Sequence, residues 1–292
     1  MSETADIIES TLEEKLKKLE EIILGYGQMI VAFSGGVDST FLLTFALKAY
    51  REAGCPDNVA AMTATGPQFA ADETGFAERF CDSLSISHKK MDVSHVLDVI
   101  RDNPQDRCYH CKKAIFGTLK ERADMVGSVL ADGTNLDDMD DYRPGHRAIQ
   151  ELGVASPLKE AGLTKAEIRK ALAAVGIDVA ADKADMPAFA CLVTRIPYGE
   201  RITGQKLEMI YAAERYFKEH GFTQVRVRCH EISEGLMARI ELEKNEMEML
   251  ISGKNGVAPA DYEGVLRELG FRYAALDLGG YEKGKMNKSV VA

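Results

Sequence analysis

Hydrophobic positions recur at helical spacing near the N-terminus and then gather in short apolar runs. The apolar residues from Ile8 to Ile23 predict an amphipathic helix that ends at Gly25. Residues 28–33 form a short apolar run that enters a Gly-Gly turn, and a helical pattern then continues to Gly54. This part of the chain is therefore predicted to form a strand, a loop and a helix.

Strand and helix patterns continue to alternate toward the middle of the chain. Predicted strands lie at residues 58–64, 84–91 and 127–133, and predicted helices lie near 69–82, within 94–125 and at 164–176. Such alternation predicts an α/β fold with a doubly wound parallel sheet. In that fold, ligands bind at the carboxyl ends of the strands.

The pattern changes in the last third of the chain. Residues 182–199 contain two prolines and little periodicity, which indicates a functional loop between domains. From Ile202 the order becomes helix, strand, strand, helix and strand, which predicts a smaller α+β domain built on an antiparallel hairpin. We expect a first domain over residues 1–185 and a second over 186–292, entered through the loop that carries Cys191.

Composition narrows the classes of partner. The 292 residues include 36 basic and 46 acidic side chains, and the formal net charge of -10 disfavours sequence-independent binding to nucleic acid. Apolar stretches are interrupted far short of the ~20 residues that a membrane helix needs. The acidic, helical N-terminal segment also differs from a secretory signal peptide. We therefore expect a cytoplasmic protein with no membrane partner.

The strongest local pattern is a glycine-containing loop between a buried strand and a helix. Glycines allow close backbone approach, and the free N–H groups of a helix N-terminus attract phosphate. A plain Gly-Gly turn is the alternative, whereas a Walker loop is excluded because its lysine is absent. The predicted phosphate-binding residues are Ser34, Gly35, Gly36, Val37, Asp38 and Ser39.

This loop resembles the SGGxDS loop of the PP-loop ATP pyrophosphatases. The resemblance implies that ATP is split between its α and β phosphates and that the loop holds the leaving pyrophosphate. It also implies that Asp38 helps to bind Mg2+, which neutralises the departing charge.

A second segment, residues 131–138, follows the last strand predicted for the first domain. Gly133 can let a nucleotide approach, and the acidic residues could hold a metal or position the loop; a solvated turn capped by Asn135 is the alternative. The segments SGGVDS, DGTNLDD, DYRPGHRA, CLVTRIPYG, RVRCH and LDLGGY resemble the LarE family of ATP-dependent sulfur transferases, which build the nickel-pincer nucleotide of lactate racemase. The ATP contacts that this resemblance implies, beyond the phosphate loop, are Gly133, Thr134, Asn135, Asp138 and Arg143.

Six cysteines in a chain of this type are more consistent with reduced, metal-bound or catalytic thiols than with a disulfide framework. Cys108 and Cys111 lie at the start of a predicted helix, where zinc, a redox disulfide, an iron-sulfur site or two ordinary helix residues all fit. Resemblance makes Cys191 the family nucleophile and sulfur donor. The remaining thiols have no cysteine partner at ligand spacing and are expected to be structural: Cys55, Cys81 and Cys229.

The added cysteine pair resembles the cluster-dependent members of the family. In those members Cys108, Cys111 and Cys191 would hold a 4Fe-4S cluster whose unique iron could bind a hydrosulfide. We favour this interpretation over a sacrificial one, in which Cys191 gives up its sulfur and becomes dehydroalanine. Zinc, with His110 as a fourth ligand, is a further alternative.

Two arginines alternate on a predicted strand of the second domain. Arg226 and Arg228 therefore point to one face, where they would suit a phosphate or carboxylate by bidentate contact; exposed strand charges are the alternative. Resemblance implies that they form the substrate phosphate site together with Arg195 and with acidic positions at Glu214 and Glu241. Glu241 could equally pair with the arginines across the hairpin.

The expected function is ATP-dependent sulfur transfer to a small nucleotide. Resemblance implies that the carboxylates of pyridinium-3,5-biscarboxylic acid mononucleotide are adenylated and then converted to thiocarboxylates with sulfide or another sulfur donor. It also suggests a homo-oligomer. Three rivals remain: a PP-loop tRNA thiolase, which the net charge of -10 disfavours; an ammonia-dependent amidoligase, which leaves the cysteines unexplained; and a zinc-stabilised nucleotide-binding regulator.

Overall fold

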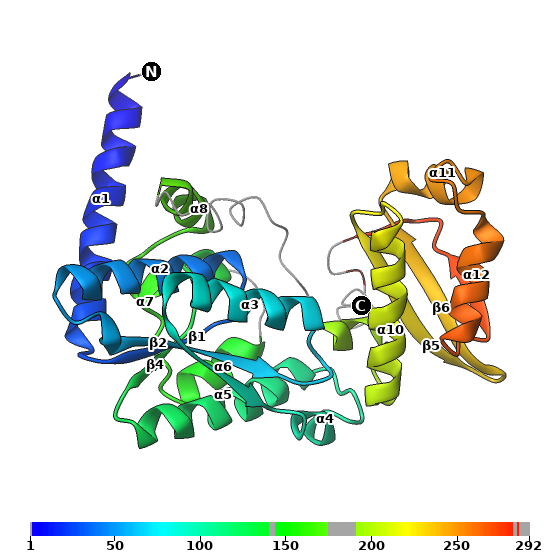
Figure 1. The fold of residues 1–292 in the computed structure, drawn as a ribbon, viewed down its shortest axis with the longest axis horizontal. Helices are drawn as coiled ribbons and strands as arrows, with labels where there is room; N and C mark the ends of the chain where they lie inside the picture. The colour runs from blue at the N-terminus through cyan, green and yellow to red at the C-terminus, as the bar shows by residue number, and fades with distance from the viewer. Residues whose placement is uncertain (1, 140–143, 175–190, 283–284, 286–292) are drawn as a thin grey trace. The chain divides into compact units, whose positions relative to one another are not determined.

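The structure is a computed structural model that describes residues 2–139, 144–174, 191–282 and 285 (Figure 1). The chain divides into two compact units. The first comprises Met1–Val96 and Cys108–Phe189, and the second comprises Leu97–Arg107 and Ala190–Ala292. The predicted domain boundary between residues 185 and 186 lies outside the described residues.

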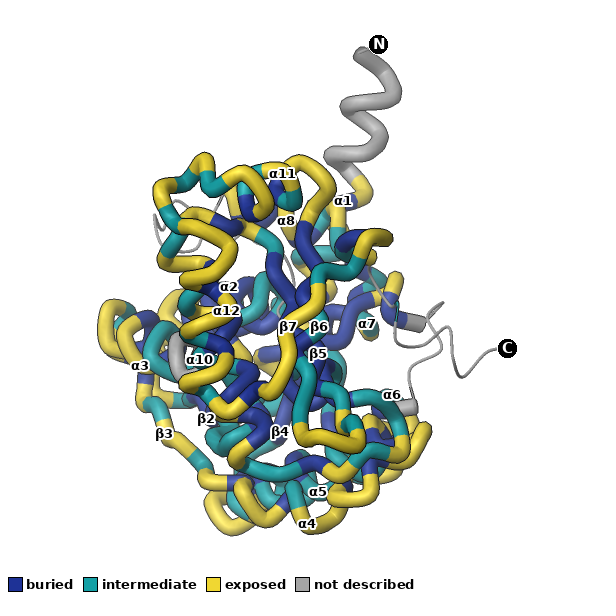
Figure 2. Tube along the Cα trace, turned by 90° about the vertical axis from the view of Figure 1, so that its right-hand side faces the viewer, coloured by how far each residue is buried: buried dark blue, intermediate teal, exposed yellow. Residues whose placement is uncertain are grey.

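The first unit is built on a four-stranded parallel sheet with the order β3-β2-β1-β4. In the centre of the sheet, Val31 pairs with Ala61 on one side and with Ala131 on the other. The edge strand β3 is largely exposed, as Figure 2 shows. The strands are β1 (Met29–Ala32), β2 (Val59–Thr65), β3 (Ser87–Asp92) and β4 (Val129–Ala131).

Helices cover both faces of this sheet. Successive residues of a strand point to opposite faces, and in β1 the apolar residues on both faces are buried. Val31 packs in a hydrophobic cluster with α1, α2 and α3, whereas its neighbour Ile30 packs in a second cluster with α5 and α6. The predicted doubly wound α/β fold is thereby confirmed. The helices are α1 (Ser2–Gly25), α2 (Val37–Glu52), α3 (Ala71–Leu84), α4 (Val96–Val99), α5 (Arg107–Met125), α6 (Pro144–Glu151), α7 (Pro157–Glu160) and α8 (Lys165–Ala174), with short 3-10 helices η1 (Pro56–Asn58) and η2 (Asp137–Met139).

The second unit contains a three-stranded sheet with the order β5-β6-β7. Strands β5 (Val225–Ile232) and β6 (Gly235–Leu242) form the predicted antiparallel hairpin, and β7 (Tyr273–Leu276) adds to β6 in parallel. The Thr203 hydroxyl accepts a hydrogen bond from the Lys206 backbone N–H at 3.2 Å and so caps α10. The other elements are η3 (Leu192–Arg195), α10 (Gly204–Glu219), α11 (Lys244–Ser252) and α12 (Pro259–Glu268).

The helical stretches predicted within 94–125 are two helices in the structure. These are α4 and α5, which are separated by a turn in which Asn103 has a φ of +50°. A residue in the left-handed region cannot continue a right-handed helix, which accounts for the break. Among the described residues, no helix is both long enough and apolar enough to span a membrane.

Candidate functional site

The predicted phosphate loop connects the end of β1 to the start of α2. Gly35 has a φ of +73°, a conformation that favours glycine, and Gly36 is extended and caps α2. The hydroxyl oxygens of Ser34 and Ser39 lie 3.1 Å apart, and the Ser39 hydroxyl also donates to the Gly36 carbonyl at 3.1 Å. These hydrogen bonds hold the loop in one conformation. The loop ends at the N-terminus of α2, whose free N–H groups can bind an anion.

The structure brings Gly133 against this loop. A Cβ added at Gly133 would lie 2.9 Å from the Ser39 backbone nitrogen and 3.1 Å from the Asp38 carbonyl carbon. Only glycine fits so close to another backbone without displacing it. The segment after β4 therefore packs on the first turn of α2, and two of the predicted ATP-contacting segments share one place in the fold.

Four polar residues of this second segment are buried, whereas Leu136 and Asp137 are exposed, so the segment is only partly a solvated turn. Asp132, Thr134, Asn135 and Asp138 are all less than 9% exposed. The Thr134 hydroxyl donates to the Asp132 carboxylate, and the Asp138 backbone N–H donates to the Asn135 side-chain oxygen at 3.2 Å. These contacts shape the segment from within. Arg143, also predicted to contact ATP, lies outside the described residues.

Two carboxylates meet where the two segments join. Burial first, and then the charge of Asp138, raise the pKa of Asp38 from 3.8 to about 6. Lys165 opposes this shift and donates to Asp138 at 2.9 Å. Sequence reasoning missed Lys165 and Arg169, which also lowers the pKa of Asp38; their spacing of four residues on α8 was the available signal. One or two carboxylates together with phosphate oxygens form the ligand set that Mg2+ prefers, so this site fits that ion.

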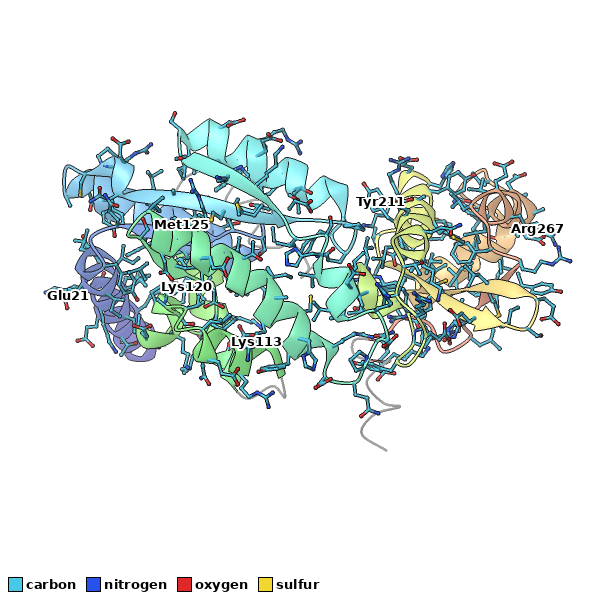
Figure 3. All side chains as sticks on the ribbon, turned by 90° about the horizontal axis from the view of Figure 1, so that it is seen from below. Glu21, Lys113, Lys120, Met125, Tyr211 and Arg267 are labelled. Atoms are coloured by element: carbon cyan, nitrogen blue, oxygen red, sulfur yellow. The ribbon has the colours of Figure 1, made fainter. Side chains whose placement is uncertain are left out.

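The cysteine pair lies at the start of α5. Cys108 is exposed and Cys111 is partly buried, and their spacing of three residues puts both on one side of the helix. Tyr109, between them, donates to Glu151 of α6 at 2.7 Å. Lys113, which is labelled on α5 in Figure 3, donates to the same carboxylate at 2.8 Å. This end of α5 is thus fixed to α6.

Cys191 lies in the second unit, just before η3, and is partly buried. Its carbonyl accepts hydrogen bonds from the Thr194 backbone N–H at 3.0 Å and from the Thr194 hydroxyl at 2.7 Å. Within the described part of the chain, no group of three or more His, Cys, Asp or Glu side chains is placed to hold a metal ion.

The thiols predicted to be structural are mostly inaccessible. Cys81 and Cys229 are fully buried, and Cys55 is partly buried. Burial raises the pKa of Cys81 to about 12 and that of Cys229 to about 11, so both remain protonated thiols.

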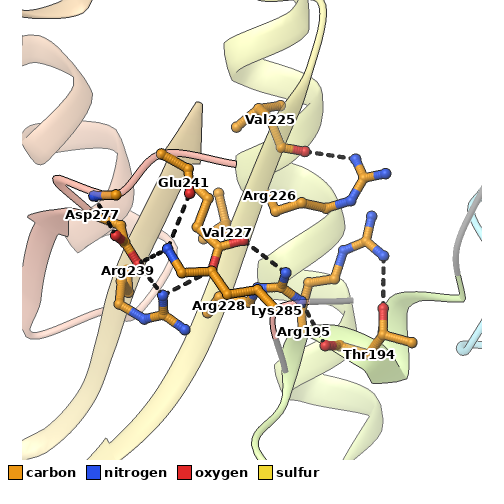
Figure 4. Close-up of polar contacts among 12 residues, drawn as sticks. Thr194, Arg195, Val225, Arg226, Val227, Arg228, Arg239, Glu241, Asp277 and Lys285 are labelled. Atoms are coloured by element: carbon orange, nitrogen blue, oxygen red, sulfur yellow. Dashed lines mark hydrogen bonds and ion pairs between the residues drawn. The ribbon is translucent and has the colours of Figure 1, made fainter. Parts of the chain in front are cut away.

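The predicted arginines of the second unit lie together and are buried, which excludes the alternative of exposed strand charges (Figure 4). The Arg195 guanidinium contacts the Glu214 carboxylate through two N–O contacts of 2.8 and 2.9 Å. Arg228 donates to Glu241 at 2.7 Å, so the predicted pairing across the hairpin is confirmed. We call the group formed by Arg195, Glu214, Arg226, Arg228, Arg239, Glu241 and Asp277 the arginine cluster.

Two guanidinium groups in the arginine cluster have N–H donors that no carboxylate of the described residues accepts, and these donors could bind an anion. Arg226 is only 9% exposed, yet within the described residues it forms no ion pair with a carboxylate; it donates to the Val225 carbonyl at 2.8 Å and lies 5.4 Å from the Tyr281 ring centroid. Burial and the neighbouring charge of Arg195 lower its pKa. The buried Nε of Arg228 has no hydrogen-bond partner among the described residues. A buried cation and a buried orphan donor are costly unless a ligand satisfies them.

Sequence reasoning missed the other side of the cluster. Arg239 donates to Glu241 at 2.8 Å and also contacts Asp277, which Lys285 contacts at 2.7 Å. Arg239 lies two residues before Glu241 on β6, so strand alternation could have indicated it. Asp277 lies in the LDLGGY segment noted in the sequence, but its contact with Arg239 depends on the pairing of β6 with β7.

Comparisons with known proteins cover almost the whole chain. A family model for the queuosine biosynthesis protein QueC matches residues 28–113, which include the phosphate loop. An uncharacterized protein of Synechocystis sp. is 36% identical over 95% of this chain and 98% of its own length. The pyridinium-3,5-bisthiocarboxylic acid mononucleotide synthase of Lactiplantibacillus plantarum is 32% identical over 96% of both chains. An uncharacterized protein of Methanocaldococcus jannaschii is 26% identical over 94% of this chain and 95% of its own length.

Proposed function

The chain belongs to the LarE family, that of the pyridinium-3,5-bisthiocarboxylic acid mononucleotide synthase, and from this premise we propose that it is an ATP-dependent sulfur transferase. Its substrate is pyridinium-3,5-biscarboxylic acid mononucleotide, and its products are the thiocarboxylates that serve nickel-pincer nucleotide biosynthesis. The observation that carries the proposal is the 32% identity spread over 96% of both chains. A relationship of that extent includes both units rather than the phosphate loop alone.

The first half-reaction uses the first unit. ATP binds with its phosphates at the loop Ser34–Ser39 and the N-terminus of α2, and a substrate carboxylate oxygen attacks the α-phosphorus. The bond to the β-phosphate oxygen breaks, so pyrophosphate leaves and an acyl-adenylate forms. Support comes from the cap geometry of the loop and from the close packing of Gly133 on it. Asp38 and Asp138 would hold Mg2+, which supplies charge neutralisation at the leaving phosphates.

The arginine cluster is proposed to bind the phosphate of the substrate. Arg226 has no carboxylate partner among the described residues, and the Arg228 Nε is a buried donor without an acceptor there. A phosphate dianion would satisfy both and would accept from planar guanidinium groups by bidentate contact. Arg195 is held by Glu214, which fixes the direction in which its fork faces.

Sulfur transfer is assigned to Cys191. In this step a sulfur nucleophile attacks the acyl carbon and AMP leaves, because adenylation has turned the carboxylate oxygen into part of a good leaving group. If Cys191 itself is consumed, its thiolate forms a thioester, and loss of the Cα proton with cleavage of the Cβ–Sγ bond gives the thiocarboxylate and dehydroalanine. Each of the two carboxylates needs its own round of adenylation and transfer.

The favoured sulfur carrier remains a 4Fe-4S cluster held by Cys108, Cys111 and Cys191, with the sacrificial Cys191 as the alternative. Such a cluster would supply an iron that carries hydrosulfide, so the protein would survive turnover. Within the first unit, α5 presents Cys108 and Cys111 on one helix face, where they would hold two irons of the cluster.

The experiment that tests the function compares the wild type with Cys191→Ala. Each protein is incubated with ATP, Mg2+, sulfide and the biscarboxylic acid mononucleotide, and pyrophosphate and thiocarboxylate are measured separately. We expect pyrophosphate from both proteins but thiocarboxylate from the wild type alone. Cys55→Ala is the matched control, since Cys55 is partly buried and has no assigned role. Thiocarboxylate formation by Cys191→Ala at the wild-type rate would contradict the assignment.

The form of the sulfur carrier needs a second measurement. Anaerobically purified protein is analysed for iron and acid-labile sulfide, and after turnover its mass is measured. About four irons and four sulfides per chain support the cluster. A metal-free protein that loses the mass of hydrogen sulfide at Cys191 supports sacrifice instead.

A further inference from the structure

The turn between α4 and α5 belongs to the second unit and contacts the segment that follows Cys191. Asn103 is fully buried and has a φ of +50°, a conformation that is strained for most residues with a side chain. Its side-chain amide donates to the Ile196 carbonyl at 3.2 Å and to the Pro197 carbonyl at 2.6 Å. Its backbone carbonyl accepts from the Gly199 N–H at 3.0 Å. One residue therefore fixes three parts of the neighbouring loop.

Arg107 completes this contact. It is 3% exposed; its Nη1 donates to the Asn103 side-chain oxygen and, at 3.4 Å, to the Ile196 carbonyl. The guanidinium carbon lies 4.1 Å from the centroid of the Tyr198 ring. Among the described residues, no carboxylate forms an ion pair with Arg107. Burying a cation without a carboxylate is unfavourable, and an apolar side chain would fill this position at lower cost.

The position of this contact along the chain suggests its use. Arg107 immediately precedes Cys108, the first thiol of α5, and Ile196 follows Cys191 at the end of η3. The contact therefore joins the residue before one proposed sulfur ligand to the loop that carries another. By contrast, the residues assigned to ATP binding belong to the first unit.

We propose that Asn103 and Arg107 are positioning residues for the sulfur-transfer step, because they fix the loop that carries Cys191 to the residue that precedes Cys108. This inference rests on the proposed function. Since ATP binds to residues of the first unit and the substrate phosphate to guanidinium groups that neither Asn103 nor Arg107 contacts, loss of the contact slows thiocarboxylate formation and leaves pyrophosphate release nearly intact. Displacement of a reacting group by about 1 Å is enough to slow a step by about a hundredfold.

The test uses the full chain with Arg107→Met, which keeps most of the volume and removes the charge and the hydrogen bonds. We expect thiocarboxylate formation to fall by at least about tenfold in kcat, with pyrophosphate release within about twofold of the wild type. Arg107→Lys keeps the charge but not the planar fork, and we expect it to stay slow. The matched control is Arg101→Met, because Arg101 lies in the same segment but is exposed and pairs with Asp98.

A second readout needs no substrate and so separates this inference from the proposed function. The rate at which iodoacetamide alkylates Cys191 is followed by mass spectrometry across a range of pH. A released loop exposes this partly buried thiol, so we expect alkylation in Arg107→Met to be at least about threefold faster than in the wild type or in Arg101→Met. If Arg107→Met does not fold, Asn103→Gly carries the same test, since glycine accepts the left-handed backbone.

Three outcomes are decisive. Unchanged Cys191 alkylation in the Arg107 and Asn103 variants would overturn the positioning role. The same conclusion would follow if pyrophosphate release and thiocarboxylate formation fell by equal factors. If the wild type makes no thiocarboxylate while Cys191 alkylation still accelerates in Arg107→Met, the proposed function fails and the positioning of the loop stands.

Discussion

Arg195 and Glu214 lie 19 residues apart and form a two-point ion pair, with N–O distances of 2.8 and 2.9 Å, in surroundings that leave their side chains 4% and 5% exposed. Glu214 also accepts the Val227 backbone N–H at 3.0 Å, so a single carboxylate links η3, α10 and β5. Its charge also favours the protonated form of the nearby Arg226.

Replacing Glu214 should therefore destabilise the second unit. Glu214→Gln removes the carboxylate charge that contacts the buried Arg195 through two oxygens, and we expect the free energy of unfolding to fall by about 3–5 kcal/mol. Urea unfolding followed by circular dichroism measures the change. Glu219→Gln on the same helix is the control, because Glu219 forms an exposed pair with Arg215 and should matter by less than about 1 kcal/mol. Equal decreases in the free energy of unfolding for the two variants would show that the buried pair stabilises the unit no more than the exposed pair does.

Arg226 should contribute to anion binding more than to stability. Its guanidinium has no carboxylate partner among the described residues, so Arg226→Met removes an unpaired buried cation. We expect inorganic phosphate, titrated by calorimetry, to bind at least about tenfold more weakly, with an unfolding free energy equal to or above that of the wild type. Arg267→Met, an exposed change on α12, serves as the control. Undiminished phosphate affinity in Arg226→Met would remove this residue from the proposed site.

Gly133 should be needed for nucleotide binding. A methyl group at this position would press on the Ser39 backbone nitrogen at 2.9 Å, and the first turn of α2 would have to move. We expect Gly133→Ala to weaken ATP binding by at least about tenfold, because the N–H groups of that turn would no longer be aligned. Gly117→Ala is the matched control: a methyl group there would meet no atom within 4 Å, and alanine favours the helix interior by about 1 kcal/mol. ATP affinity equal to wild type in Gly133→Ala would refute the close-packing argument.

Asp38 should make stability depend on pH. Burial raises its pKa from 3.8 to about 6, so between these values the folded chain keeps a proton that the unfolded chain has released. The stabilising contribution of the protonated form is fully present below about pH 4 and is lost as the pH rises through about 6. We expect Asp38→Asn to be more stable than the wild type at about pH 7.5 and to lose most of this advantage at about pH 4. Chemical unfolding at both values measures the difference, and a constant gap would contradict the assignment.

The exposed and the buried cysteines should differ in their rate of alkylation. Burial raises the pKa of Cys81 to about 12 and of Cys229 to about 11, so the thiolate is scarce at neutral pH and reagents cannot reach it. Cys108 is exposed at the start of α5. Iodoacetamide should therefore modify Cys108 at least about a hundredfold faster than Cys81 in the native protein, and unfolding in urea should abolish the difference. Rapid native labelling of Cys81 would show that its part of the core opens readily.

Features that depend on neighbouring residues in the sequence could be predicted, and features that depend on distant partners could not. The phosphate loop was found because its glycines, its strand and its helix are contiguous, and the shared face of Arg226 and Arg228 follows from strand alternation. The spacing of Lys165 and Arg169 indicates two cations on one face of α8 but not their proximity to Asp38, because α8 and the phosphate loop meet only in the folded chain. The same holds for Asp277, which reaches Arg239 through the pairing of β6 with β7.

The hydrophobic pattern also did not predict the turn that contains Asn103. Its partners Ile196 and Pro197 lie 93 and 94 residues away, and a helical pattern covers the turn on both sides. Periodicity reports which face of an element is buried and says nothing about which distant carbonyl an amide will meet. The association of Leu97–Arg107 with the second unit was therefore visible only in the structure.

That association also affects which fragments of the protein can fold and when the second unit can fold during synthesis. A fragment that begins at Ala190 would contain Ile196, Pro197 and Gly199 but not Asn103, so their backbone groups would lose the partners that they have in the whole chain. On the ribosome, Asn103 is synthesised 93 residues before Ile196, so the hydrogen bond between them cannot form until Ile196 has been added. Maturation of the second unit is for this reason a late event, dependent on a piece of chain that emerged early, and truncation at the loop would remove part of what the unit needs to fold.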